Sequence, residues 1–76
     1  MNIVIVGSGK VGAHIAEQLV REKHNITIID LDDYTLQRLS QTLDIMTIKG
    51  NGVSPQTLKE ARADVSDLVI ELADFD

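Results

Sequence analysis

Several residue types that carry chemistry or cross-links are scarce in this chain. Its 76 residues include no cysteine and no tryptophan, with only one tyrosine and one phenylalanine. Without cysteine there is neither a disulfide nor a thiolate metal site, a composition compatible with the cytosol. Two aromatic rings are too few to form a platform on which nucleic-acid bases stack. The composition therefore excludes disulfide-stabilised scaffolds and argues against single-stranded nucleic-acid binding.

Positive charge and long apolar runs are also scarce. Seven basic residues stand against twelve acidic ones, which gives a formal net charge of −5. This balance repels nucleic acid and anionic lipid, because the few basic residues do not cluster. No apolar run approaches the roughly 20 residues of a membrane span, and the start of the chain does not resemble a signal peptide. We therefore expect a cytoplasmic domain that binds no nucleic acid and does not insert into a membrane.

The first feature that is present is a glycine-rich turn after a short apolar run. The apolar residues 3–6 lead into a G-x-G-x-x-G pattern at Gly7, Gly9 and Gly12. In a dinucleotide-binding unit the first glycine makes the turn, the second lets backbone approach a pyrophosphate, and the third lets helix and strand pack closely. The phosphates then rest on unpaired N–H groups at the helix start. The candidate phosphate-binding residues are Gly7, Ser8, Gly9, Lys10, Val11 and Gly12.

A helix and a second strand follow this turn. An apolar stripe of period 3.6 is formed by Val11, Ile15, Ala16, Leu19 and Val20. This stripe predicts a helix of about three turns. Residues 26–29 then predict a strand that ends at Asp30. Strand, glycine turn, helix and strand thus follow one another in the order that a dinucleotide-binding unit requires.

Asp30 lies 18 residues past Gly12, close to the position of the acid that receives the ribose hydroxyls of NAD. A carboxylate there accepts hydrogen bonds from the 2′-OH and 3′-OH and repels a 2′-phosphate. The sequence therefore favours NAD or an adenosine nucleotide over NADP, with Asp30 and the adjacent Leu31 as candidate binding residues. Two alternatives stay open: Asp30 is a solvated strand-end acid or cap, and the glycine turn binds nothing.

The rest of the chain continues to alternate between helices and strands. Asp32 predicts the cap of a second helix, whose leucines share one face. Residues 45–48 predict a third strand, Pro55 the start of a short third helix, and residues 68–72 a fourth strand. This alternation predicts an α/β fold, a Rossmann-like, doubly wound parallel sheet with strand order 3-2-1-4. Residues 1–76 would form the N-terminal half of such a domain, a truncated NAD-binding domain.

The carboxyl ends of parallel strands meet at one edge of the sheet, and the separate signals converge there. Besides the glycine turn and Asp30, this edge receives a second glycine-bearing turn after the third strand and Ala73 after the fourth. The turn consists of Gly50, Asn51 and Gly52. It either contacts the nucleotide or simply supplies a positive-φ turn, which needs only Gly or Asn.

Three motifs together resemble the TrkA N domains, the nucleotide-binding RCK or KTN domains of potassium transport regulators. They are the sequence IVGSGKVG at residues 5–12, Ile29-Asp30 followed by a leucine-bearing helix, and the GNG turn at residues 50–52 with a helix from Pro55. The resemblance implies a domain that is not an enzyme and that binds NAD(H), or alternatively ATP or ADP. Its partners would be other copies of itself and an integral-membrane potassium transporter or channel subunit, which places it peripheral to the inner face of the membrane.

The resemblance also assigns roles to single residues. The three glycines of the first turn would hold phosphate, Asp30 the adenosine ribose, and residues 50–52 the adenine edge. The fourth strand departs from the family pattern, because Glu71, Ala73 and Asp76 stand where a small residue, a threonine and an acid are usual. The missing threonine hydroxyl and the added carboxylate of Glu71 are unfavourable for contact with the distal half of the ligand.

Two classes of enzyme share parts of this pattern. Asp30 and Asp32 resemble the nucleophile loop of haloacid-dehalogenase-like phosphatases, but the strand is second rather than first and the remaining catalytic acids have no place. A fragment of an NAD-dependent dehydrogenase shares the same glycine motif, yet hydride transfer needs a substrate domain and an acid or base. His14 and His24 lack a second ligand at metal-binding spacing. We therefore expect no catalytic and no metal-binding residues.

Overall fold

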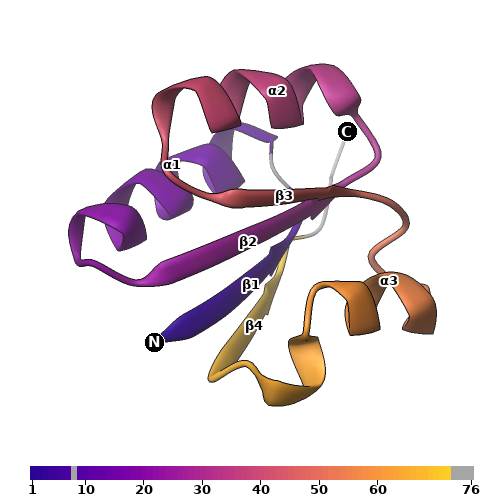
Figure 1. Cartoon of the computed structure of the whole chain (residues 1–76). Helices are drawn as coiled ribbons and strands as arrows, with labels where there is room; N and C mark the ends of the chain where they lie inside the picture. The colour runs from indigo at the N-terminus through magenta and orange to yellow at the C-terminus, as the bar shows by residue number, and fades with distance from the viewer. Residues whose placement is uncertain (8, 73–76) are drawn as a thin grey trace.

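The computed structural model describes residues 1–7 and 9–72, and Figure 1 shows the whole chain. Helices and strands alternate from the first residues onward. In chain order the elements are β1 (Asn2–Val6), α1 (Gly9–Arg21), β2 (Asn25–Asp30), α2 (Asp33–Thr42), β3 (Met46–Lys49), α3 (Pro55–Glu60), the 3-10 helix η1 (Ala63–Val65) and β4 (Leu68–Glu71).

The four strands form one parallel sheet in the order β3-β2-β1-β4. In the middle of β1, Val4 pairs with Thr27 of β2 on one side and with Val69 of β4 on the other. A parallel sheet requires each connection to cross one of its faces, and the helices make these crossings. This architecture confirms the expected Rossmann-like α/β fold and its strand order.

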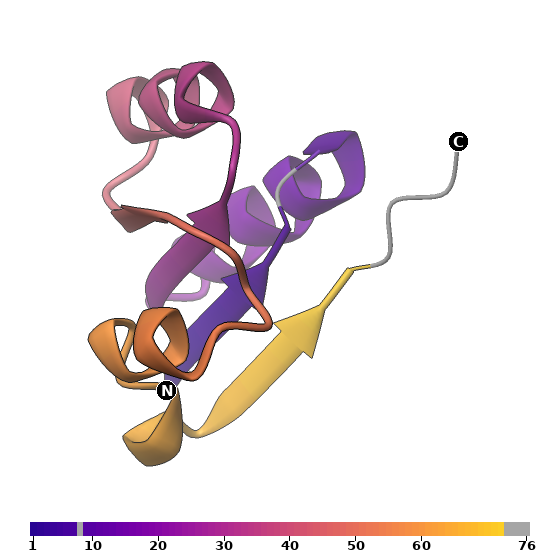
Figure 2. The same ribbon diagram turned by 90° about the vertical axis from the view of Figure 1, so that its right-hand side faces the viewer.

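The two faces of the sheet are covered by different helices, as Figures 1 and 2 show. Because side chains alternate along a strand, Ile3 and Ile5 of β1 face α1 and α2, while Val4 faces α3. The first of these two cores is the larger, and it includes buried residues from β1, β2, α1 and α2. The smaller core joins Val4 and Ile29 to Ala61 at the end of α3. The protein therefore has three layers, with the sheet in the middle.

The predicted face of α1 needs one correction. Val11 was expected on the apolar stripe that packs against the sheet, but its side chain is 65% exposed. Gly12 and Ala16 are the buried residues of α1, with Ile15 and Leu19 partly buried beside them. A glycine therefore takes the position closest to the sheet in the first turn, where a valine side chain would not fit.

The start of α2 follows the predicted capping. The carboxylate of Asp32 accepts hydrogen bonds from the main-chain N–H of Tyr34, at 3.1 Å, and from the hydroxyl of Thr35, at 2.7 Å. These bonds satisfy donors that the first turn of a helix leaves unpaired. Leu36 and Leu39 are buried, as their shared face predicted.

The segment that leads to β4 is short and partly exposed. Pro55 occupies the first turn of α3 as predicted, but the side chain of Ser54, which precedes it, makes no capping hydrogen bond. The ladder of β4 ends at Glu71, one residue before the predicted end, although the N–H of Leu72 still donates to the carbonyl of Val6 at 3.0 Å. Among the described residues, no helix is long and apolar enough to cross a membrane.

Candidate functional site

The glycine turn after β1 has the geometry that its sequence predicted. Gly7 has a φ of +92°, a conformation that side chains with a Cβ rarely adopt. Its N–H donates to the carbonyl of Ile29 at 2.8 Å, which joins the turn to the last residues of β2. A Cβ on Gly7 would also lie 3.1 Å from the carbonyl oxygen of Leu72. Both its backbone angle and its surroundings therefore require glycine. Ser8 lies outside the described residues.

Gly12 brings the first turn of α1 against this loop. A Cβ placed on it would lie 2.8 Å from the main-chain oxygen of Gly7 and 3.1 Å from Cδ1 of Leu72. A carbonyl cannot move aside as the tip of a flexible side chain can, so a larger residue would push the helix away from the loop. Gly12 thus has the packing role that the motif predicted.

The opposite holds for Gly9, whose position faces open space. Apart from the neighbours of Gly9 in sequence and the backbone of its own helix, no atom of residues 1–7 and 9–72 would lie within 4 Å of a Cβ at this position, and the φ of Gly9 is +40°. Gly9 begins α1, so the N–H groups of this turn have no partner within the helix. The first turn of α1 contains no acidic residue, and Lys10 and Val11 are exposed. Main-chain donors are therefore accessible here, without a carboxylate in that turn that would repel an anion.

Asp30 ends β2 beside the glycine turn. Its carbonyl accepts a hydrogen bond from the N–H of Gly50 at 3.0 Å, which joins the end of β2 to the loop after β3. Its carboxylate oxygen Oδ1 accepts from the N–H of Asp32 at 2.7 Å. This bond closes a local turn two residues long and orients the carboxylate, whereas the cap of α2 is Asp32 itself. The adjacent Leu31 is 67% exposed at the same edge of the sheet.

The loop at residues 50–52 is built by close packing rather than by positive φ. A Cβ on Gly52 would lie 2.1 Å from Cγ1 of Val6, and one on Gly50 would lie 2.9 Å from the side chain of Thr57. None of these three loop residues has a positive φ, so the positive-φ interpretation of this turn is wrong. The side chain of Asn51 accepts from the N–H of Val53 at 3.0 Å, which closes a short local turn.

The structure therefore brings most of the predicted residues to one edge of the sheet. Two main-chain hydrogen bonds, from Gly7 to Ile29 and from Gly50 to Asp30, connect the loops that follow β1 and β3 to the last two residues of β2. Glu71 ends β4 and is exposed. Ala73, the predicted residue after β4, lies outside the described part of the chain.

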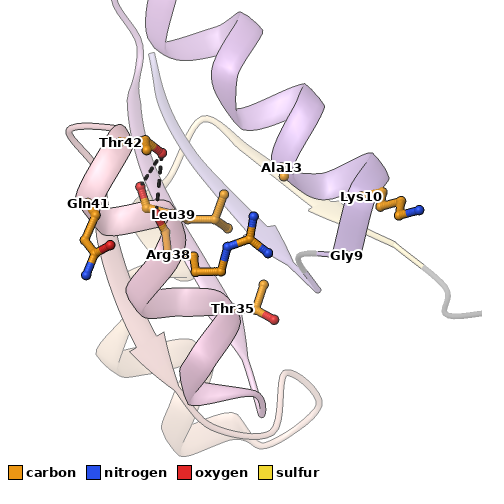
Figure 3. A pocket seen from close by; sticks show the side chains of 8 residues that line it. All are labelled: Gly9, Lys10, Ala13, Thr35, Arg38, Leu39, Gln41 and Thr42. Carbon is orange, nitrogen blue, oxygen red and sulfur yellow. Dashed lines mark hydrogen bonds between the residues drawn. The ribbon is translucent and has the colours of Figure 1, made fainter.

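A cavity that the sequence did not predict lies between the start of α1 and α2. Its volume is about 490 Å³, and Figure 3 shows the residues around it. It is lined by Gly9, Lys10, Ala13, Thr35, Arg38, Leu39, Gln41 and Thr42. The local sequence does not predict this cavity, because Lys10 and Arg38 are 28 positions apart. The two residues line one cavity only because α1 and α2 pack on the same face of the sheet.

In residues 1–7 and 9–72, no group of three or more His, Asp or Glu residues could hold a metal ion. His14 is exposed on α1, and Nδ1 of His24 lies 2.9 Å from the amino group of Met1. Neither histidine lies at the edge of the sheet where the glycine turn and Asp30 meet.

A parallel sheet of order 3-2-1-4 with alternating helices, and with a glycine turn at the carboxyl end of β1, defines a Rossmann-like α/β fold. A family model described as the TrkA-N domain matches residues 3–76. The chain therefore belongs to the TrkA-N domain family.

Its relatives include proteins named Trk system potassium uptake protein TrkA. The chain is 40% identical to the one from Halomonas elongata and 37% identical to the one from Haemophilus influenzae, over all 76 residues and 17% of each relative. A homolog from Methanothermobacter thermautotrophicus is 33% identical over 92% of the chain and 32% of its own length. The chain thus spans between a sixth and a third of the length of these relatives.

Proposed function

We propose that this chain is a nucleotide-sensing regulatory domain of a potassium uptake or channel system. Support comes from its membership of the TrkA-N domain family and from relatives named as potassium uptake proteins. The observation that carries the proposal is the convergence of the loops after β1 and β3 on the end of β2, at one edge of the sheet, through the hydrogen bonds of Gly7 and Gly50. The domain acts by binding and carries out no reaction.

The proposed ligand is NAD(H), with ATP or ADP as the alternative. Its phosphates would bind the main-chain N–H groups at the open start of α1, around Gly9, with Lys10 and Val11 beside them. The carboxylate of Asp30 would accept hydrogen bonds from the ribose hydroxyls. Its position at the end of β2 supports this role, and its negative charge disfavours the 2′-phosphate of NADP.

The remaining proposed contacts surround the adenine and the far half of the ligand. Leu31 is an exposed apolar residue next to Asp30. The loop at residues 50–52 is also close to Asp30, because the N–H of Gly50 donates a hydrogen bond to the carbonyl of Asp30. Ser8 and Ala73 complete the proposed set on sequence grounds alone. Close packing of Gly52 on Val6 keeps this loop near the end of β1.

The proposed partners are further copies of the chain and an integral-membrane potassium transporter or channel subunit. The names of the relatives support a membrane transport system as the context. In this proposal the domain stays in the cytoplasm and reaches the inner face of the membrane through its partner. Binding of the nucleotide would change the state of the oligomer, and the transporter would respond to that change.

Calorimetric titration of the purified protein with NADH, NADPH, ATP and ADP tests the ligand. We expect NADH to bind more tightly than NADPH, because only NADPH brings a 2′-phosphate toward Asp30. Equal affinities for NADH and NADPH would contradict the assigned role of Asp30. Absence of heat with all four ligands would contradict nucleotide sensing as a whole.

A further inference from the structure

The cavity between α1 and α2 is half open to solvent and has the volume of a small-molecule site. Its volume of about 490 Å³ falls within the range of roughly 300 to 1,000 Å³ that is typical of ligand pockets. It adjoins the open start of α1 at Gly9 and extends along two turns of α2, from Thr35 to Thr42 (Figure 3). Most of its lining residues belong to α2 and have no part in the proposed nucleotide site.

The charges that line this cavity are all positive. Lys10 and Arg38 are its two charged residues, and no carboxylate lines it, although the chain as a whole has a net charge of −5. Neither cation forms an ion pair with any residue in the described part of the chain. In Figure 3 the guanidinium of Arg38 extends into the gap toward α1, whereas Lys10 points outward at the rim. Arg38 is therefore the principal cation of the cavity.

The other lining residues provide an apolar floor and fixed polar walls. Leu39 is buried and Ala13 partly buried, and both belong to or pack against the larger core. The hydroxyl of Thr35 donates to Asp32, and that of Thr42 donates to main-chain carbonyls of its own helix. Since those protons are already used, the side-chain donors that α2 offers a ligand are those of Arg38 and Gln41, in addition to the donors of Gly9 and Lys10 on α1.

Arg38 has one side-chain contact that favours its orientation in the absence of a ligand. Its guanidinium carbon lies 5.9 Å from the centre of the Tyr34 ring, one turn earlier on α2. A cation over an aromatic face is attracted to it, and the contact reduces the number of side-chain conformations lost on binding. A planar guanidinium held in this way can donate two parallel hydrogen bonds to a phosphate or carboxylate.

From these observations we infer that the cavity between α1 and α2 is a second ligand site, which binds a small organic anion with an apolar or aromatic body. The phosphate or carboxylate contacts Arg38, and the body covers Ala13 and Leu39. The site is separate from the proposed nucleotide site, whose other residues lie in the loops after β1, β2 and β3. Only Gly9 and Lys10 border both sites.

Phenyl phosphate and benzoate are suitable probes, and phenol is the matched neutral body. Each is titrated into ¹⁵N-labelled protein while the main-chain amide signals are followed by NMR. We expect phenyl phosphate or benzoate to shift the amides of residues 35–42, which have no part in the proposed nucleotide site, and phenol to bind at least about tenfold more weakly. Comparison of the two anions distinguishes a phosphate ligand from a carboxylate ligand.

Arg38→Gln removes the cation and retains a shorter polar side chain with two of the three methylene groups. We expect it to weaken binding of the preferred anion about tenfold, and Arg38→Lys to weaken it less, because lysine keeps the charge without the planar donors. Arg21→Gln is the matched control, since it removes the same charge from an exposed position in the last turn of α1. The control should bind the probe as the parent protein does.

Three outcomes would overturn the inference: neither anion binds, phenol binds as well as the anions, or Arg38→Gln binds like the parent. Shifts confined to residues 7, 9–12, 30 and 50–52 would also overturn it, because the probe would then occupy the nucleotide site. Titrations with NADH separate the two proposals. Arg38→Gln should leave NADH affinity unchanged, and a failure of NADH to bind would contradict the proposed function without affecting the anion site.

Discussion

The N–H of Gly7 donates a 2.8 Å hydrogen bond to the carbonyl of Ile29, the residue immediately before Asp30. The turn proposed to bind phosphate and the acid proposed to bind ribose are therefore connected through a single main-chain bond. Because the bond uses no side-chain atom, substitution of Asp30 leaves it in place. Changes in ligand preference after such a substitution can thus be assigned to the carboxylate itself.

Asp30→Ala should narrow the difference in affinity between NADH and NADPH. The substitution removes hydrogen bonds from a charged acceptor, so we expect NADH to bind about tenfold more weakly. It also removes the repulsion of the 2′-phosphate, so NADPH should lose less affinity or gain some. Calorimetric titration of both ligands measures the two constants.

Asp44→Ala is the control for this experiment. Asp44 is exposed and precedes β3, at the opposite end of the sheet from Asp30, and its removal changes the net charge by the same amount. The control should keep the preference of the parent protein. If Asp30→Ala keeps the full preference for NADH over NADPH, the ribose role is contradicted. The carboxylate of Asp30 would then only accept the hydrogen bond from the N–H of Asp32.

Gly12→Ala should destabilise the fold although alanine favours helices. The new Cβ would lie 2.8 Å from the carbonyl oxygen of Gly7. We expect overpacking to cost about 3 kcal/mol, against a gain of about 1 kcal/mol in helix propensity. Urea unfolding should therefore give a loss of about 2 kcal/mol, while the exposed His14→Ala on the same helix should change stability by less than about 0.5 kcal/mol. An unchanged or increased stability of Gly12→Ala would show that the loop can yield.

Gly52→Ala should also destabilise the protein, and Val6→Ala should relieve part of the effect. The added Cβ would lie 2.1 Å from Cγ1 of Val6, and truncation of Val6 removes that atom. In a double-mutant cycle measured by urea unfolding, we expect a favourable coupling of at least about 1 kcal/mol between the two substitutions. Strict additivity would mean that the loop at residues 50–52 moves away from β1 instead.

The protein should show no turnover of alcohols or hydroxy acids with NAD, and none of phosphomonoesters with Mg²⁺. The described residues contain neither a metal-binding cluster nor a histidine at the sheet edge that carries Asp30. Spectrophotometric screens of both reactions provide the test. Reproducible turnover that Asp30→Ala abolishes would favour the dehydrogenase or the phosphatase alternative over a sensing role.

The protein should associate through β4. Within residues 1–7 and 9–72, the outer edge of β4 has no partner strand, and Leu68 and Val69 are 45% and 39% exposed. Exposed apolar edges favour pairing with a second chain. Light scattering over a dilution series should show a dimer or larger assembly, which Val69→Lys shifts toward monomer. Met46→Lys, on the other edge strand, should have less effect, and a monomer at every concentration would contradict this prediction.

The elements of the fold were predictable because their signals are local. Gly7 and Gly12 are identified by their spacing, and Asp32 by its place before a helix. The burial of α1 was predicted less well. The periodicity placed Val11 on the buried face of the helix, but Gly12 packs closely against the loop and Val11 is exposed. Periodicity describes one face of a helix, but it does not measure how near the helix lies to its neighbours.

The unpredicted parts of the candidate sites depend on tertiary packing. Position 52 requires glycine because the side chain of Val6 packs against it. Val6 lies 46 positions earlier in the chain, so the local sequence of the turn does not predict this contact. In the same way, the sequence of α2 predicts that its leucines are buried, but it does not predict where the exposed Arg38 lies relative to α1. Arg38 and Lys10 line the same cavity because α1 and α2 pack next to each other on the sheet.

The central position of β1 has a consequence for the order of folding. β1 pairs with β2, about 23 residues later, and with β4, about 65 residues later, and the N–H of Asn2 donates to Asp67 at the start of β4. The β1–β2 contact can form early, whereas the other edge of β1 must wait for the last strand. During synthesis on the ribosome this edge stays open until β4 emerges. Chaperones that bind extended apolar segments would therefore find one edge of β1, from Ile3 to Val6, accessible until residues 68–71 have been made.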